Sequence, residues 1–295
     1  MDALNELLTV VIPVKNEEKN LPACLENVRE FEHVVLVDSG SSDRTVEIFE
    51  EIRDKRLEIR CGWEVVEFRW DGKFPKKRNW VLRNYKFKTP WVMFLDADER
   101  LTEEWKEEVE RRLKVEGGRL NRGGVELEGR IDAWVCYYDN WFMGRMLKHG
   151  DVMRKTAILR VGKGEYERIE EDRWSKLDME IHEHLQVEGK IGEIKARLEH
   201  HDKRSLESYY AKHEEYANWE ANRYRELMKD PDAFARLPPR QKRKYSLIAK
   251  WWFGFAYFCA CYFAKLGFLD GKAGLVFAWG KCRYFRNIRK KILRG

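Results

Sequence analysis

The most informative part of the sequence is Trp91-Val92-Met93-Phe94-Leu95-Asp96-Ala97-Asp98. Its five apolar residues predict a buried strand, and two carboxylates one residue apart follow at the C-terminal end. Ligands of parallel α/β sheets bind at this edge. Two hard oxygen ligands there suit Mg²⁺ or Mn²⁺, which proteins usually hold through one or two carboxylates together with substrate phosphates. Acidic residues after a strand can also be simple helix caps, so the triplet alone leaves both interpretations open.

Strand and helix patterns alternate before this stretch. Apolar, β-rich runs predict strands at 8–14, 34–37, 63–68 and 91–95, and helical spacing predicts helices at 18–31, 42–52 and 74–85. Such alternation indicates a mostly parallel sheet covered by helices on both faces. Further on, the sequence predicts a helix over 102–115, a glycine-rich loop or hairpin over 117–124, strands at 130–138, 157–161 and 179–185, and a long helix over 205–228. The predicted fold class is therefore α/β, with a helical C-terminal region.

Charge is distributed unevenly along the 295 residues. The net charge is +6, but residues 236–295 hold fifteen Lys and Arg against one acid, Asp270, so this end carries +14 and the preceding part −8. An acidic body with a basic end indicates an anionic partner for that end. The six cysteines form no C-x-x-C pair and the first residues lack the basic flank of a secretory signal, which predicts reduced thiols in a cytosolic protein.

Polar motifs follow three of the predicted strands. They are Val11-Ile12-Pro13-Val14-Lys15-Asn16-Glu17, Val37-Asp38-Ser39-Gly40-Ser41-Ser42-Asp43-Arg44-Thr45 and Phe94-Leu95-Asp96-Ala97-Asp98-Glu99. In order, spacing and strand context they resemble the family 2 glycosyltransferases, which have the Rossmann-like GT-A fold. Later motifs resemble a bacterial subfamily that includes lipopolysaccharide-core β-1,4-glucosyltransferases: Asn140-Trp141-Phe142-Met143-Gly144-Arg145, His149-Gly150, Ile158-Leu159-Arg160-Val161 and Ile181-His182-Glu183.

The resemblance implies a role for each matching residue. Pro13, Asn16 and Glu17 would line the nucleotide pocket, and Asp38 would accept a hydrogen bond from uracil or ribose. Lys77 or Arg78 would reach the nucleotide or its diphosphate, although Lys76-Lys77-Arg78 could equally be a solvated helix face. Asp96 would contact ribose or metal, Asp98 would hold Mn²⁺ or Mg²⁺, and His182 could be a further metal or diphosphate contact. Such a set fits the chemistry, because a departing sugar diphosphate needs positive charge to neutralise it.

Inversion at the anomeric carbon also needs a base that takes the proton of the acceptor hydroxyl. Glu183 matches the His-Glu motif of the subfamily and is preferred. Asp172, in Glu171-Asp172, resembles the Glu-Asp pair that supplies the base in other family 2 enzymes. His200 and His201 lack paired cysteines and zinc-ligand spacing, so no zinc site is predicted there.

Residues 251–264 form an uncharged run of 14 residues, rich in aromatic side chains and flanked by basic residues. A bilayer span needs about 20 apolar residues, so the run is too short to cross. Trp and Tyr favour the headgroup level and Lys and Arg favour anionic lipid, which predicts a monotopic anchor on the cytoplasmic leaflet. A helical hairpin packed on the catalytic domain is the alternative. Nucleic acid fits poorly, because the aromatic residues form a block and do not alternate with basic ones.

The combined prediction is a GT-A catalytic domain over 1–204, with a donor half at about 1–101 and an acceptor half at about 102–204, and a helical, membrane-associating region over 205–295. Its function would be inverting, metal-dependent transfer of a sugar, in the first instance glucose, from a UDP-sugar to a cell-envelope glycan or lipid-linked acceptor at the inner face of the cytoplasmic membrane. The alternatives are a polyprenyl-phosphate glycosyltransferase of the same fold and a non-catalytic nucleotide-sugar-binding membrane protein. A nucleotidyltransferase would differ from all of these by releasing diphosphate.

Overall fold

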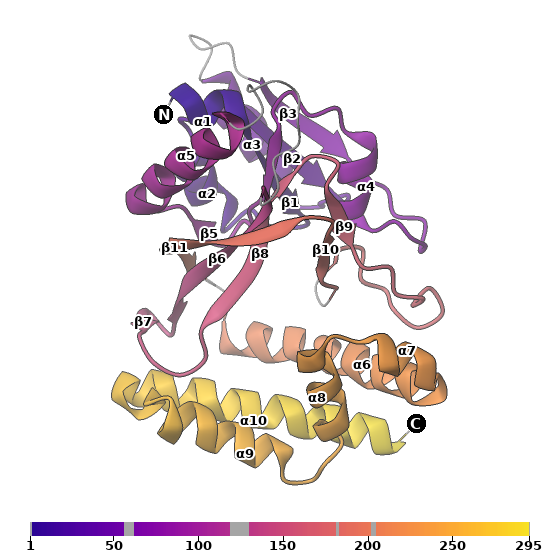
Figure 1. Cartoon of the computed structure of the whole chain (residues 1–295). Helices are drawn as coiled ribbons and strands as arrows, with labels where there is room; N and C mark the ends of the chain where they lie inside the picture. The colour runs from indigo at the N-terminus through magenta and orange to yellow at the C-terminus, as the bar shows by residue number, and fades with distance from the viewer. Residues whose placement is uncertain (1, 56–61, 119–129, 181–182, 202–204, 295) are drawn as a thin grey trace. The chain divides into compact units, whose positions relative to one another are not determined.

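The computed structural model describes residues 2–55, 62–118, 130–180, 183–201 and 205–294 (Figure 1). The chain forms two compact units. The first contains Met1–Asp139, Met153–Asp172 and Lys176–Lys203, and the second contains Asn140–Val152, Arg173–Ser175 and Arg204–Gly295. Each unit is described by itself.

The first unit is built on a mixed sheet with the order β3-β2-β1-β4-β8-β6-β11-β5 among the described residues. Its first four strands are parallel: β3 (Gly62–Glu67), β2 (His33–Asp38), β1 (Leu8–Val14) and β4 (Trp91–Phe94). Antiparallel pairing begins where β8 (Met153–Arg160) joins β4 and β6 (Ile131–Phe142) joins β8, and recurs where β11 (Lys190–His201) pairs with β5 (Glu99–Arg100). The α/β prediction is confirmed, with the parallel part consisting of β3 and the three strands that carry the motifs.

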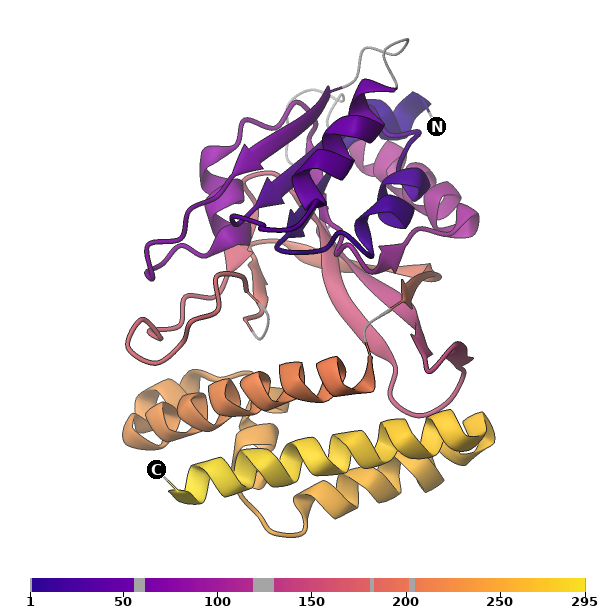
Figure 2. The ribbon, with the colours of Figure 1, turned by 180° about the vertical axis from the view of Figure 1, so that it is seen from behind.

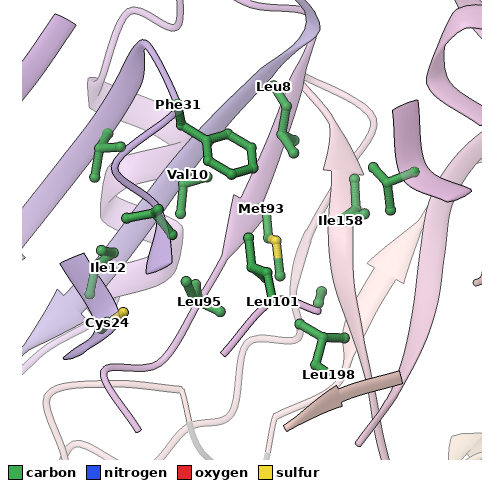
Figure 3. Packing of buried hydrophobic residues seen from close by; sticks show 14 of the residues in the cluster. Leu8, Val10, Ile12, Cys24, Phe31, Met93, Leu95, Leu101, Ile158 and Leu198 are labelled. Carbon is green, nitrogen blue, oxygen red and sulfur yellow. The ribbon is translucent and has the colours of Figure 1, made fainter. Parts of the chain in front are cut away.

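Alternation along the central strands divides the core between two faces of the sheet. Val10, Ile12 and Met93 point to one face, where they meet residues of α1 (Asp2–Leu7), α2 (Leu21–Asn27), α3 (Thr45–Asp54) and α5 (Glu103–Gly118) (Figure 3). Val11 and Val92 point to the other, toward α4 (Lys77–Asn84) and the small sheet of β9 (Gly164–Tyr166) and β10 (Leu185–Val187). Because both faces are covered, β1 and β4 are buried at every position and not only at alternate ones.

Several predicted boundaries are corrected by the structure. The strand expected at 179–185 is wrong, since the described residues there are irregular and β10 begins only at Leu185. Gly117 and Gly118 end helix α5 and do not lie in a loop, while residues 119–124 are outside the described residues. The helix predicted at 18–31 is limited to α2, because the chain turns after Glu17 and Pro22 lies in the first helical turn.

The second unit is helical apart from strand residues at Asn140–Phe142 and β7 (Arg145–Leu147). Its long helices are α6 (Leu206–Lys229), capped by Ser205, and α10 (Gly271–Arg294). Between them lie α7 (Pro231–Arg236), α8 (Pro239–Leu247), α9 (Phe253–Cys259), the π-helical turn η1 (Ala260–Ala264) and the 3₁₀ turn η2 (Gly267–Asp270). Helix α10 packs against both α6 and α9 (Figure 2). None of the helices in the described part of the chain has the length and apolar character needed to cross a bilayer.

Candidate active site

Parallel pairing brings the three motifs to one edge of the sheet. Val14, the last residue of β1, pairs with Asp38, the last residue of β2, and Val11 pairs with Phe94 at the end of β4. The chain leaves all three strands in the same direction, so Asn16, Asp38 and Asp96 follow neighbouring strands at their carboxyl ends. This is the edge at which α/β sheets bind ligands.

Side-chain hydrogen bonds connect the loop after β1 to the loop after β2. Asn16 adopts a left-handed φ of 57°, and its side-chain carbonyl accepts a 2.8 Å hydrogen bond from the Ser42 backbone N–H. An amide side chain tolerates that conformation better than most, which explains asparagine at the turn. Asp38 is buried and accepts hydrogen bonds from the backbone N–H groups of Gly40 (2.9 Å) and Ser41 (3.0 Å). Both predicted binding residues therefore also hold the loops in shape.

Pro13 and Glu17 have structural positions in the same region. Pro13 is buried inside β1 opposite Val37. Glu17 accepts a 2.8 Å hydrogen bond from the Asn20 side chain, and its backbone N–H donates to Thr45 Oγ1 at 2.8 Å. These contacts fix the turn that leads from β1 into α2.

The basic triplet at the start of α4 is buried, so its interpretation as a solvated helix face is wrong. Lys76, Lys77 and Arg78 are 4%, 2% and 7% exposed. Glu180 fixes the N-terminus of this helix, because its carboxylate accepts hydrogen bonds from the backbone N–H groups of Arg78 (2.8 Å) and Asn79 (3.0 Å). A carboxylate at a helix N-terminus satisfies free donors and complements the helix dipole.

Lys77 and Arg78 both reach the strand edge from α4. The Lys77 ammonium donates a 2.8 Å hydrogen bond to the backbone carbonyl of Val14, and burial lowers its pKa to about 8 despite the opposing effect of Asp178. The Arg78 guanidinium donates to Asp96 Oδ1 at 2.7 Å and to the Glu180 backbone carbonyl at 2.6 Å. Two cations thus end at the strand termini.

Asp96 lies in a network of charges that also includes β8. Lys155 Nζ is 2.8 Å from Asp96 Oδ2 and 2.7 Å from Glu99 Oε1. Burial disfavours the charge of Asp96, but Lys155 and Arg78 outweigh burial and hold its pKa well below the usual range. At Glu99 burial prevails over Lys155 and raises the pKa, and the negative charges of Asp96 and Asp98 raise it further. Asp96 is therefore ionised and flanked by cations.

Asp98 is the carboxylate of the pair that faces another potential metal ligand. It is 8% exposed, and its Oδ2 lies 3.5 Å from Nε2 of His200, near the end of β11. A carboxylate suits Mn²⁺ and Mg²⁺, and an imidazole is a common ligand of divalent transition metals. No group of three or more His, Cys, Asp and Glu side chains arranged to hold a metal occurs among the described residues, and the predicted ligand His182 lies outside them.

The two candidate bases line one small pocket of the first unit, about 10 Å³ in volume. Glu183 is buried, and Lys76 Nζ lies 2.6 Å from its Oε1 while also pairing with Glu171. Burial and the neighbouring Glu183 raise the pKa of Glu171. Asp172 lines the same pocket but is exposed. The structure thus brings both candidates together, one buried in an ion cluster and one at the surface.

Residues that the sequence interpretation missed complete the site. Lys155, Glu180 and His200 come from β8, from the loop before β10 and from β11, respectively. None of the three lies in a motif that follows a parallel strand. Only the antiparallel pairing of β8 with β4 and of β11 with β5 places Lys155 and His200 beside the acidic pair.

Comparison with known proteins agrees with this geometry. The model of the glycosyl transferase family 2 matches residues 9–122, which include all three strand-end motifs. The lipopolysaccharide core biosynthesis glycosyltransferase LpsC of Rhizobium meliloti is 25% identical over 278 residues, covering 92% of this chain and 89% of that protein. Residues 9–122 form a glycosyl transferase family 2 domain, and the chain is a glycosyltransferase.

Two further similarities of this glycosyltransferase are informative. An undecaprenyl-phosphate 4-deoxy-4-formamido-L-arabinose transferase of Pseudomonas aeruginosa is 51% identical, but over only 53 residues, or 15% of each chain. The solved structure of the mannosyltransferase PcManGT from Pyrobaculum calidifontis, in complex with GDP-Man and Mn²⁺, aligns with 97% of this chain and 87% of its own, at 15% identity and a TM-score of 0.50. This likeness supports the GT-A fold.

Proposed function

We propose that this glycosyltransferase is an inverting, metal-dependent enzyme. It moves a sugar, in the first instance glucose, from a UDP-sugar to a cell-envelope glycan or lipid-linked acceptor such as lipopolysaccharide core. The observation that carries the proposal is the charge at the sheet edge, where Arg78 and Lys155 converge on Asp96 next to Asp98. The similarity to LpsC over most of the chain supports the acceptor class.

The donor would lie across the ends of β1, β2 and β4. The nucleotide would be bound by Pro13, Asn16, Glu17 and Asp38. The backbone of the loops after β1 and β2 would form the wall of this part of the site. Lys77 and Arg78 would stabilise the diphosphate, since both are held close to the strand ends and positive charge there offsets the charge of the leaving group. Placing these cations in advance avoids reorganisation during transfer, which is how preorganised sites lower barriers.

A divalent cation fits best beside Asp98. Asp98 and His200 would hold it, because their side chains already face each other at 3.5 Å. Asp96 is the weaker ligand, since two cations already compensate its charge, and its more natural partner is the donor ribose. His182 remains a proposed additional contact. When bound, Mn²⁺ or Mg²⁺ supplies positive charge to the departing diphosphate.

Glu183 is our first candidate for the base, with Asp172 as the second. To act, Glu183 would have to exchange its contact with Lys76 for the acceptor hydroxyl, which requires the small pocket to open. Asp172 needs no such opening. The two assignments therefore differ in the expected effect of substitution. Replacing the residue that acts as the base should lower kcat with little change in the KM for the donor.

The test is release of UDP from UDP-glucose and other UDP-sugars in the presence of a lipopolysaccharide-core acceptor and Mn²⁺. We expect a 10²–10⁴-fold loss of kcat in Glu183→Gln, the usual range for a general base, and no such loss in Asp172→Asn. Glu170→Gln is the matched control, because Glu170 is an exposed acid of the same loop. Equal activity of wild type and Glu183→Gln would reject Glu183 as base, and no UDP release with any sugar and acceptor would reject the transferase assignment.

A polyprenyl-phosphate acceptor is the second candidate, favoured by the short, 51% identical match to an undecaprenyl-phosphate transferase. A phosphate acceptor is already ionised and needs no strong base. In that case Glu183→Gln would keep activity with a polyprenyl phosphate. Either acceptor is membrane-held, so we place the enzyme at the inner face of the cytoplasmic membrane, peripherally attached.

A further inference from the structure

The second unit carries an unusual concentration of exposed apolar side chains. Sixteen large apolar residues are exposed in the described part of the chain, and nine of them fall between Trp251 and Trp279. These nine are Trp251, Trp252, Phe255, Phe263, Leu266, Phe268, Leu269, Leu275 and Trp279, with exposures from 39% to 69%. We name this set the hairpin face. Exposed apolar groups gathered in one segment mark an interaction site more often than scattered ones do.

Ring contacts connect part of the hairpin face across three elements. The Phe258 ring contacts Trp279 of α10 with a centroid distance of 5.9 Å and Tyr262 at 5.4 Å. Tyr262 in turn contacts Phe263 at 5.1 Å and Phe268 at 6.3 Å. The half-buried rings of Phe258 and Tyr262 therefore join exposed Phe263, Phe268 and Trp279 into one surface.

The opposite side of α9 already has its packing partners within the unit. Phe253 and Tyr257 lie 4.9 and 4.7 Å from the ring of Phe285 on α10. Gly254 approaches α10 so closely that an added Cβ would lie 3.0 Å from the Cys282 carbonyl oxygen. Helix α9 thus has two apolar sides, one packed on α10 and the other exposed.

The charge around the hairpin face is positive. Lys250 and Lys272 are exposed, and the Arg286 guanidinium lies 5.2 Å from the ring centroid of exposed Phe255. The single acid of residues 236–295, Asp270, is buried and accepts hydrogen bonds from the backbone N–H groups of Lys148 and His149. Asp151 is likewise paired, with Lys265 and Tyr257. The partner of the face must therefore tolerate aromatic insertion and offer negative charge.

We infer that the hairpin face docks flat on an anionic lipid bilayer. Its aromatic side chains enter the boundary between headgroups and acyl chains, about 5–10 Å deep, and Lys250, Lys272 and Arg286 contact lipid phosphates. Three tryptophans suit that depth, because the indole ring is apolar with one polar N–H. The inference deepens the proposed peripheral attachment by naming the face and the lipid class, and it does not depend on sugar transfer.

The test is co-sedimentation of the full chain with phosphatidylglycerol vesicles and with phosphatidylcholine vesicles, without donor or acceptor. We expect wild type to sediment with the anionic vesicles more than with the neutral ones. The double variant Phe263→Ser/Trp279→Ser should bind them roughly 100-fold more weakly, at about tenfold for each half-exposed aromatic ring. The control Val115→Ser/Ile191→Ser removes apolar side chains that are similarly exposed (53% and 48%) on the first unit, and should bind like wild type.

Trp fluorescence with brominated phosphatidylglycerol gives a second readout. Wild type should be quenched, and Trp251→Phe and Trp279→Phe should each lose part of the quenched signal. Equal sedimentation of wild type and the double variant would overturn the inference, as would no sedimentation of wild type. A concentration-dependent dimer in light scattering that the double variant abolishes, without vesicle binding, would instead assign the face to a second copy of the chain. Because none of these readouts involves turnover, their failure is distinct from failure of the proposed transferase activity.

Discussion

Replacing Lys76 by methionine tests the ion cluster that holds the first candidate base. Lys76 lies between Glu171 and Glu183, and the three side chains are 5%, 4% and 2% exposed. Methionine retains most of the apolar volume but removes the ammonium, which leaves two buried carboxyl groups side by side. Removing one partner of a buried ion pair costs about 3–5 kcal/mol, so we expect a loss of that size in the free energy of unfolding near pH 8.

The loss should shrink as the pH falls. Burial and Glu183 already raise the pKa of Glu171, and Lys76 is what opposes that rise. Without Lys76 the folded variant holds a proton at a pH where the unfolded chain has released it, so its stability declines as pH rises above about 4.5. The difference between wild type and variant is therefore larger at pH 8 than at pH 5.

Urea unfolding at the two pH values measures this difference. Lys73→Met is the matched control, since Lys73 is exposed three residues earlier, and its effect should stay within about 0.5 kcal/mol. The double variant Lys76→Met/Glu171→Gln, which removes the excess carboxylate, should recover part of the loss. A loss below about 1 kcal/mol, or one that is equal at pH 5 and pH 8, would refute the electrostatic reasoning.

Three further predictions concern the strand edge. Burial lowers the pKa of Lys77 to about 8, so the folded chain binds fewer protons than the unfolded chain between pH 8 and 10.5. The free energy of unfolding, measured with urea, should therefore rise with pH over that range in wild type and change less in Lys77→Met. The variant Glu180→Gln should lose about 1–2 kcal/mol of the free energy of unfolding, because an amide nitrogen, which donates, replaces one of the two oxygens that accept hydrogen bonds at the start of α4. An unchanged melting temperature would contradict this. His200→Ala should weaken Mn²⁺ binding at least tenfold in calorimetric titration without lowering stability in EDTA, and unchanged Mn²⁺ affinity would remove His200 from the proposed metal site.

The parallel strands could be predicted from sequence because their signal is local. Both faces of β1, β2 and β4 are buried, so each strand appears as a mostly apolar run followed by polar residues. Parallel pairing then requires their carboxyl ends to meet. This is why the predicted positions of Asn16, Asp38 and Asp96 at one edge agree with the structure.

The charged residues around Asp96 could not be predicted in the same way. Lys155 and His200 follow the acidic pair by more than fifty residues, and their positions depend on non-local antiparallel pairing. Lys76 and Lys77 were ambiguous for a different reason: three consecutive basic residues normally avoid the core. They are buried here because Glu171, Glu183 and the Val14 carbonyl provide partners that have no sequence signature.

A metal-dependent donor site at Asp98 can be tested by calorimetric titration of UDP-glucose into wild type and Asp98→Asn, each with and without Mn²⁺. We expect UDP-glucose to bind wild type only when Mn²⁺ is present and not to bind Asp98→Asn. Equal binding with and without Mn²⁺ would contradict the metal role of Asp98. Absence of binding for UDP-glucose and for every other nucleotide sugar tried would contradict the donor site itself.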